Sequence, residues 1–348
     1  MGLRARHGRT ALLLLSAGYL LYRARAHRAA WSLFGQTVLI TGGSRGLGFA
    51  IARRAVDAGA RVAICGRDAA SLGRAHRALQ GGQGQALALT CDVTDRAAVD
   101  AMLSVVRDLY GPVDLLVTCA GAIAVGPLAS LERTEFERTV DVNFWGTVHP
   151  TLAVLPEMRQ RGAGRIAHIS SIGGKVGVPH LAAYSASKFA VAGFSEALRA
   201  EVAAEGVHVT TIFPGLMRTG SPRHARFTGD HRAEHAWFTV GDSLPLVSVD
   251  AERAAARILL GCQRGEAEIV FPLAARAAVL GRALAPGAAA RVLSIVNRLL
   301  PQGPAHPTPA RSGADSASRL APSALTALTN AAERRYNQLP DSAVPAAI

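Results

Sequence analysis

The stretch Thr41-Gly42-Gly43-Ser44-Arg45-Gly46-Leu47-Gly48 decides the fold of this chain. It follows a short β-rich run at residues 37–40, and it opens a helical stretch that extends to Ala58. A glycine turn in this position lets the backbone approach a pyrophosphate, and the helix N-terminus presents unpaired N–H groups to the phosphates. The glycine spacing is G-x-x-x-G-x-G rather than G-x-G-x-x-G. The turn therefore predicts a dinucleotide site at the first strand-to-helix connection.

Strand-like and helical runs alternate from residue 36 to about residue 272. The strand-like runs are short and apolar, and they lie at residues 37–40, 61–65, 85–90, 113–118, 165–169, 207–213 and 268–270. Such alternation implies parallel strands joined by right-handed crossovers, with both faces of the sheet covered by helices. The sequence therefore predicts an α/β catalytic domain at 36–272, a Rossmann-type doubly wound parallel sheet of about seven strands with helices on both faces.

The positive charge lies at the two ends of the chain. The formal net charge is +13, and residues 1–30 hold six arginines and no acid, while residues 271–348 hold eight arginines and three acids. Basic ends suit an anionic membrane surface or an acidic partner, and solvated arginine-rich tails are the alternative. Because no basic stripe with interleaved aromatics and no zinc-ligand spacing is present, we expect no nucleic-acid partner.

The N-terminal segment, residues 1–30, combines an apolar run at 10–22 with basic flanks. A helix of this length falls short of the ~30 Å hydrocarbon core. Arg23, Arg25 and Arg28 occupy the place where a signal-peptide cleavage site belongs. We interpret the segment as an apolar helix in contact with a membrane, with a signal-peptide core or a packed helix as alternatives. Four scattered cysteines indicate buried free thiols, so we expect a cytoplasmic, membrane-associated protein without a metal site.

The composition changes after Phe271. Residues 273–300 are rich in Ala, Leu and Arg, and Val292, Ile295, Val296 and Leu299 follow helical spacing. We interpret 273–300 as an amphipathic helix packed on the domain, with an interfacial membrane helix as the alternative. Residues 301–325 are rich in Pro, Ser and Ala, so we predict a largely disordered tail over 301–348, with a short helix near 324–336.

The end of the second strand indicates which dinucleotide binds. An acid at this position usually holds the ribose of a cofactor that lacks the 2′-phosphate. Here Gly66 and Arg67 stand in that place, and Arg45 lies inside the glycine turn. Guanidinium groups bind phosphate with paired donors, so the two arginines favour NADP(H), although each alone could be a surface residue. Asp92, after the third strand, could accept a hydrogen bond from the adenine amino group or serve only as a turn residue.

Tyr184 and Lys188 lie four residues apart, a spacing that stacks two side chains on one helix face. A free phenol has a pKa of ~10, and a nearby ammonium group lowers that pKa by stabilising the phenolate. Tyr184 could then exchange a proton with a substrate oxygen while the cofactor exchanges a hydride. Ser171, just after the strand at 165–169, could hold the same oxygen.

The chain resembles the short-chain dehydrogenases/reductases over residues 36–272. The resemblance rests on the TGxxxGxG turn, Asp92 in Cys-Asp-Val, Asn143 in Val-Asn-Phe-Trp-Gly, Ser171 ahead of the Tyr184/Lys188 pair, and Pro214-Gly215 followed by Thr219. It implies that Tyr184 is the acid/base and Ser171 the substrate-oxygen ligand. It also implies that Lys188 binds the nicotinamide ribose and that Asn143 holds a water linked to Lys188. We expect the cofactor to contact Gly42, Ser44, Arg45, Gly46, Leu47, Gly48, Arg67, Asp92, Val93, Ala120, Gly121, Tyr184, Lys188, Pro214, Gly215 and Thr219.

The resemblance also guides the expected partners. It implies a small-molecule alcohol or carbonyl substrate, apolar or lipid-like, and a homodimer or homotetramer formed by the helices that carry Asn143 and Tyr184. Cys119 departs from the family, because an asparagine usually stands there and a thiol cannot make its amide hydrogen bonds. The competing functions are a non-catalytic dinucleotide-binding sensor and a membrane-surface scaffold on the same fold.

Overall fold

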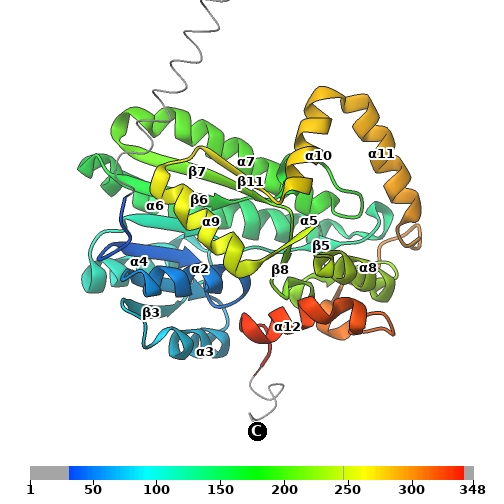
Figure 1. Ribbon diagram of the computed structural model, residues 1–348, viewed down its shortest axis with the longest axis horizontal. Helices are drawn as coiled ribbons and strands as arrows, with labels where there is room; N and C mark the ends of the chain where they lie inside the picture. Colours follow the sequence, from blue (N-terminus) through cyan, green and yellow to red (C-terminus); the bar gives the residue numbers. More distant parts are fainter. Residues whose placement is uncertain (1–30, 246, 341–348) are drawn as a thin grey trace, which may run out of the picture.

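The computed structural model describes residues 31–245 and 247–340 (Figure 1). The predicted apolar helix at 1–30 lies outside these residues. Seven parallel strands form the central sheet in the order β11-β7-β6-β4-β1-β2-β3. Their bounds are β1 (Thr37–Thr41), β2 (Arg61–Gly66), β3 (Gln85–Thr90), β4 (Leu115–Thr118), β6 (Gly164–Ile169), β7 (Val207–Pro214) and β11 (Glu268–Phe271). The predicted doubly wound sheet is therefore confirmed, and its strand order reverses between β1 and β4, where such folds bind ligands.

Helices cover both faces of this sheet, and each face has its own apolar core. Successive strand residues point to opposite faces, so Ile40 joins the core with Ile51 and Ile258, while Leu39 joins the core with Leu103 and Met158. The helices of the first face are α2 (Gly46–Asp57), α3 (Ala69–Leu79) and α9 (Ala251–Arg264). Those of the second face are α4 (Arg96–Tyr110), α6 (Gly146–Arg161) and α7 (Ala182–Val202).

Two small sheets and a helix lie beyond the carboxyl ends of the main strands. β8 (Leu216–Arg218) pairs with β10 (Ser248–Asp250), and β9 (Arg226–Phe227) lies between β5 (Ala124–Val125) and β12 (Arg311–Ser312). The helix α8 (His231–Ser243) packs against this layer, where Phe227 and Phe238 are buried in a separate apolar cluster. The segment at 216–248 thus covers the same edge of the main sheet as the glycine turn.

The C-terminal tail corrects one prediction, because residues 301–340 are folded against the domain rather than largely disordered. β12 pairs antiparallel with β9, and the main-chain N–H groups of Thr308 and Gly313 donate to Ser130 and Ala225. The tail lacks an apolar core of its own, and its main chain is held instead by partners far away in the sequence. The predicted short helix is present as α12 (Ala327–Arg335).

The segment 273–300 forms two helices, α10 (Leu273–Leu284) and α11 (Pro286–Leu299), where one packed helix was predicted. Pro286 begins the second helix, a position that suits proline. α11 has no buried residue and α10 has only Ala275, so the interpretation of a helix packed on the domain is wrong for α11. Figure 1 shows the pair as a hairpin that projects from the body. Within 31–245 and 247–340, no helix is long and apolar enough to cross a bilayer.

Candidate active site

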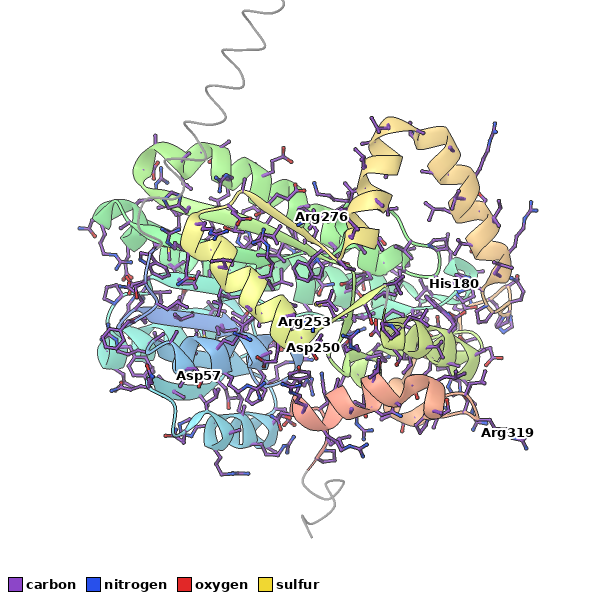
Figure 2. All side chains as sticks on the ribbon, viewed as in Figure 1. Asp57, His180, Asp250, Arg253, Arg276 and Arg319 are labelled. Carbon is purple, nitrogen blue, oxygen red and sulfur yellow. The ribbon has the colours of Figure 1, made fainter. Side chains whose placement is uncertain are left out.

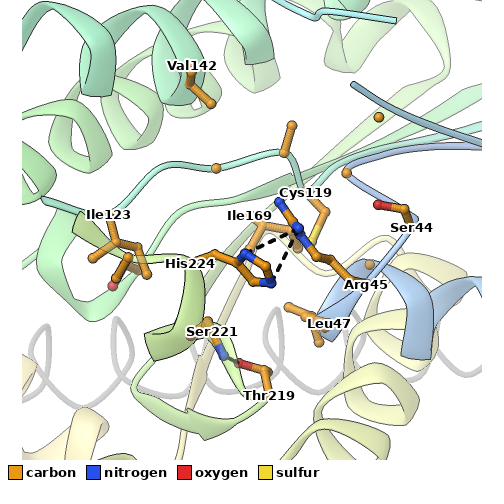
Figure 3. Close-up of a pocket in the computed structure, with 18 of the residues that line it drawn as sticks. Ser44, Arg45, Leu47, Cys119, Ile123, Val142, Ile169, Thr219, Ser221 and His224 are labelled. Atoms are coloured by element: carbon orange, nitrogen blue, oxygen red, sulfur yellow. Dashed lines mark hydrogen bonds between the residues drawn. The ribbon is translucent and has the colours of Figure 1, made fainter. Parts of the chain in front are cut away.

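A cavity of about 670 Å³ opens at the carboxyl edge of the main sheet, where β1 and β4 part. Figure 3 shows part of its lining, including the glycine turn. The lining contains Ser171 and every residue that the sequence analysis assigned to the cofactor, from the turn at 42–48 to Thr219. Asn143 does not line the cavity but lies behind it. Side chains from distant parts of the sequence therefore meet in one space.

The glycine turn has the close packing that a phosphate-binding loop requires. Gly42 has a φ of +66°, and a Cβ there would lie 2.7 Å from the backbone of Ala120. A Cβ on Gly48 would lie 2.3 Å from the carbonyl oxygen of Gly42. α2 begins without a side-chain cap and with no acid in its first turn. The positive end of its dipole thus faces the cavity, which fits the phosphates of a dinucleotide.

Positive groups lie at the end of β2, beside the turn. Gly66 and Arg67 line the cavity with Arg45, and burial lowers the pKa of the Arg45 guanidinium. Arg45 Nη1 lies 3.3 Å from the ring of His224 (Figure 3). Arg67 lies 3.9 Å from Asp92 in an exposed pair, which costs little to separate. The arrangement fits a dianionic 2′-phosphate, since two guanidinium groups are present and no acid ends the strand.

The predicted tyrosine and lysine are both on α7 and both face the cavity. Burial raises the pKa of Tyr184 to about 12, and a hydrogen bond with Ser171 partly opposes that rise. Burial lowers the pKa of Lys188 to about 8. The Lys188 ammonium lies 5.8 Å from the Tyr184 ring centre, and its Nζ donates to the carbonyl oxygen of Ile169 at 2.8 Å. At neutral pH the phenol is therefore protonated beside a mostly charged amine.

Ser171 and Asn143 support this pair from either side. Ser171 follows β6, and its hydroxyl accepts a hydrogen bond from the N–H of Gly173 at 3.1 Å. Asn143 lies in a π-helical turn, and its side-chain amide donates to the carbonyl oxygen of Ala122 and to Ser187 Oγ. Its Oδ1 accepts from the N–H of Ala122 at 2.8 Å. The amide of Asn143 thus fixes the loop after β4 against the helix that carries Lys188.

The main chain at Cys119 is hydrogen-bonded at the sheet edge, whereas the buried hydroxyl of the neighbouring Thr118 has no partner among the described residues. The hydroxyl of Thr41 accepts from the main-chain N–H groups of Cys119 and Ala120, at 3.2 and 3.3 Å. Burial raises the pKa of the Cys119 thiol to about 11, so the thiol is neutral. A threonine at the end of β1 therefore supports the loop at the position where the family asparagine would stand.

Sequence reasoning missed several residues of this site. His224 was not assigned to the site from the sequence, yet it lines the cavity beside Arg45. Gln338 lines the cavity from the other end of the chain, and no local pattern marks it. Asp68 lies in the lining after Arg67, where it caps α3 by accepting from the N–H of Ser71 at 2.6 Å. Only the Asp68 cap could have been recognised, since Asp before a helical run is an N-cap signal.

The comparison with known families is decisive. The family model of short chain dehydrogenases matches residues 36–227. The chain belongs to the short-chain dehydrogenase family. It is thus an oxidoreductase that acts between an alcohol and a carbonyl group with a nicotinamide dinucleotide, as the sequence analysis predicted.

Individual relatives agree with this membership. A dehydrogenase/reductase SDR family protein 7-like protein of Anopheles gambiae is 35% identical over 274 residues, which cover 77% of this short-chain dehydrogenase and 84% of the relative. A putative ketoacyl reductase of Streptomyces coelicolor is 39% identical over 186 residues, 53% of this chain and 71% of that one. The crystal structure of an actinorhodin polyketide ketoreductase variant with NADPH has a TM-score of 0.61 at 33% identity, covering 68% of this chain and 95% of that one.

Proposed function

We propose that this enzyme is an NADP(H)-dependent carbonyl reductase in which Tyr184 gives a proton to the substrate oxygen. The observation that carries the proposal is the position of the protonated Tyr184 phenol, which is hydrogen-bonded with Ser171 in the cavity that also contains the glycine turn. A protonated phenol is fit to act as a general acid, which is the role needed for reduction of a carbonyl. Oxidation would require the same group to lose its proton first.

The side chains can divide the work as follows. The hydroxyls of Ser171 and Tyr184 bind the carbonyl oxygen of the substrate. When bound, NADPH supplies the hydride. Tyr184 donates its proton as negative charge develops on the oxygen, and the nearby Lys188 ammonium stabilises the phenolate that remains. Asn143 keeps the loop after β4 in place, and a water on this residue would return a proton through Lys188.

The preference for NADP(H) rests on Arg45 and Arg67. Both line the cavity next to Gly66, where a family member that prefers NAD(H) would carry an acid. The ketoreductase with NADPH is a structural relative of this chain, which supports the same choice. We therefore expect NADPH to be the better cofactor.

The substrate side of the cavity favours an apolar molecule. Ile123, Val142, Met217 and Ala225 line it, and the aromatic cluster of α8 lies behind. An apolar or lipid-like ketone or aldehyde is the substrate class that we propose. The test is NADPH consumption with a panel of such carbonyl compounds, with NADH as the comparison. Tight NADPH binding without turnover of any member would instead support a non-catalytic sensor.

We also propose that the enzyme works at an anionic membrane surface on the cytoplasmic side. The sequence of residues 1–30 is one candidate for this contact. The α10–α11 hairpin is a second, because it exposes Leu273, Leu284 and Leu299 at 79%, 76% and 81%. Residues 273–300 contain four arginines and no acid. A face that combines apolar side chains with arginines and has no acid is complementary to anionic lipid. A second copy of the same face would place positive charge against positive charge.

Co-sedimentation with anionic and with neutral vesicles tests this membrane contact. The Leu299→Asp variant should pellet less with anionic vesicles than the native chain, and Leu109→Asp, at an exposed leucine of α4, is the matched control. A chain that lacks residues 1–30 measures the share of the N-terminus. Equal pelleting of Leu299→Asp and the native chain would exclude the hairpin as a membrane contact. A different native mass of Leu299→Asp and the native chain in the absence of vesicles would indicate that the hairpin binds a protein partner.

The oligomer that we propose is a homodimer or homotetramer formed through the helices that carry Asn143 and Tyr184. Trp145, Leu152 and Phe189 on these helices are 45%, 49% and 38% exposed, although they are large and apolar. Burial of such side chains against a second copy removes apolar surface from water. Light scattering of a Leu152→Arg variant should give the monomer mass if this face forms the interface, and an unchanged mass would contradict it.

A further inference from the structure

The last described part of the chain folds back on the cofactor turn. We call residues 327–338, which are α12 and the three residues after it, the clasp. α12 packs beside α8, and the chain then turns toward the start of α2 (Figure 1). The clasp lies outside the family match, which ends at residue 227. The clasp therefore comes from a part of the chain that the family model does not cover.

Tyr336 anchors the clasp. Its side chain is fully buried in the core formed by α2 and α9, and its hydroxyl donates to the Asp250 carboxylate at 3.2 Å. Asp250 caps the start of α9, where Figure 2 labels it. The main-chain carbonyl of Tyr336 accepts from the N–H of Gly46, the first residue of α2, at 2.9 Å. The clasp is thus bonded directly to the glycine turn.

Asn337 joins the turn to α3. Its φ of +57° lies in the left-handed region, which asparagine tolerates better than most residues. Its side-chain amide donates to the carbonyl oxygens of Ser44 and Ser71 at 2.6 and 2.9 Å. Its Oδ1 accepts from Nε of Arg74 at 2.9 Å. One side chain therefore fixes the position of the glycine turn, the start of α3 and a guanidinium group together.

The guanidinium that Asn337 holds lies beside the two predicted 2′-phosphate ligands. Burial is the main cause of the low pKa of Arg45. The Asp68 carboxylate opposes this shift, and the positive charges of Arg67 and Arg74 add to it. Three cations and one carboxylate, Asp68, therefore act on one another at the end of β2, which leaves a net positive charge. A bound dianion would balance that charge.

Gln338 enters the cavity on the other side of the turn. Its Nε2 donates to the main-chain oxygen of Thr219 at 2.7 Å, which fixes the orientation of the amide because a carbonyl cannot donate. Its main-chain oxygen accepts from His224 at 3.2 Å, and the His224 ring contacts Arg45. Its Oε1 is buried and has no hydrogen-bond partner among the residues that the structure describes. An unpaired buried acceptor on a residue that lines a ligand cavity indicates that the ligand brings the donor.

We propose that the clasp completes the cofactor site. Asn337 is a positioning residue that holds Arg74 for the 2′-phosphate, and Gln338 accepts a hydrogen bond from a hydroxyl or amide group of the nicotinamide half. The two residues therefore act on different parts of the cofactor, and only the action of Asn337 depends on the 2′-phosphate. This inference rests on the NADP(H) use proposed above.

Binding of isolated ligands tests the clasp without requiring turnover. Calorimetry of the full chain with NADPH, NADH and the half-cofactor adenosine 2′,5′-bisphosphate measures separately how the 2′-phosphate and the nicotinamide half contribute to binding. For Asn337→Ala we expect about tenfold weaker binding of NADPH and of the bisphosphate, with a smaller loss for NADH because the Ser44 bond to the glycine turn is also removed. For Gln338→Leu we expect weaker binding of NADPH and NADH by similar factors, with the bisphosphate unchanged. Asn330→Ala, the same substitution earlier on α12, is the control and should change none of them.

The outcomes separate this inference from the proposed reductase activity. Arg74→Ala leaves the clasp in place and should reproduce the Asn337→Ala pattern if Asn337 acts through Arg74. Equal loss of NADPH and NADH binding in Asn337→Ala would reduce the residue to a structural role and overturn the positioning claim. Unchanged binding in Gln338→Leu would overturn the second contact. A native chain that binds NADPH and turns over no carbonyl would refute the activity alone.

Discussion

Replacement of Tyr184 by phenylalanine removes one hydroxyl from a cavity that offers no equal substitute. The phenol is the protonated group beside Lys188, with a pKa of about 12. The ammonium of Lys188 is bonded to the Ile169 oxygen at 2.8 Å, and the Ser171 hydroxyl accepts from Gly173. A serine hydroxyl can still hold the substrate oxygen, but it is a much weaker acid than the phenol. The substrate would then have to take its proton from water.

The magnitude follows from the role of a general acid. Loss of one positioned proton donor reduces a rate by about 10²- to 10⁴-fold, which corresponds to ~3–5 kcal/mol on the barrier. We expect the upper part of this range for Tyr184→Phe because the Lys188 ammonium is held by the Ile169 oxygen and the Ser171 hydroxyl is a much weaker acid than the phenol. Cofactor affinity should change by less than about tenfold, since one hydrogen bond at most is lost.

The assay is steady-state NADPH consumption with the best carbonyl substrate, together with NADPH binding by calorimetry. Tyr110→Phe is the matched control, because it removes a phenol from α4, outside the cavity lining. The control should retain native turnover. If Tyr184→Phe keeps more than about a tenth of the native kcat, Tyr184 is not the proton donor and the mechanism fails.

Three further changes test the glycine turn, Lys188 and the buried carboxyl of Asp242 on α8. Gly48→Ala places a Cβ 2.3 Å from the carbonyl oxygen of Gly42. Calorimetry should therefore show a loss of NADPH binding, and thermal unfolding should show a lower Tm. Native NADPH affinity in this variant would mean that the turn can open to accept the methyl group. Because burial lowers the pKa of Lys188 to about 8, the rate of carbonyl reduction should decline as the pH rises through that value. The residual rate of Lys188→Met should show no such decline. The same decline in the native enzyme and in Lys188→Met would mean that another group titrates. Burial raises the pKa of Asp242 from 3.8 to about 8, so its contribution to stability is present at low pH and is lost as the pH rises through that range. The Tm of Asp242→Asn should therefore exceed the native Tm more at pH 9 than at pH 5, and an equal gap would show that Asp242 is charged in the folded state.

Periodicity was enough to predict the sheet. The strands at 37–40 and 85–90 are continuous apolar or β-rich runs, and parallel strands covered on both faces need such runs. The alternation of strands and helices along the chain then implies that helical crossovers join neighbouring parallel strands. The glycine turn and the Tyr184/Lys188 pair could be predicted because each is a short motif whose geometry depends on a single helix or turn.

Long-range contacts explain what the sequence did not show. Residues 301–325 have a composition typical of disorder, yet β12 pairs with β9 through main-chain groups that composition does not register. The apolar residues of α11 follow helical spacing. That spacing does not show whether the apolar face contacts the rest of the protein, lipid or solvent. The contact of Gln338 with Thr219 joins residues 119 positions apart, so no window of sequence contains both.

The same reasoning bears on how the cofactor site is held together. The glycine turn, which we expect to bind the phosphates, connects β1 to α2. Its glycines add no side-chain contacts that would hold it in one conformation. Its rigidity must come from neighbours, and the clasp supplies bonds to two of its residues, Ser44 and Gly46. Removal of residues 327–348 should therefore weaken NADPH binding even though none of the predicted catalytic side chains is lost. A truncated chain that stays folded by circular dichroism and binds NADPH with native affinity would show that the turn needs no such support.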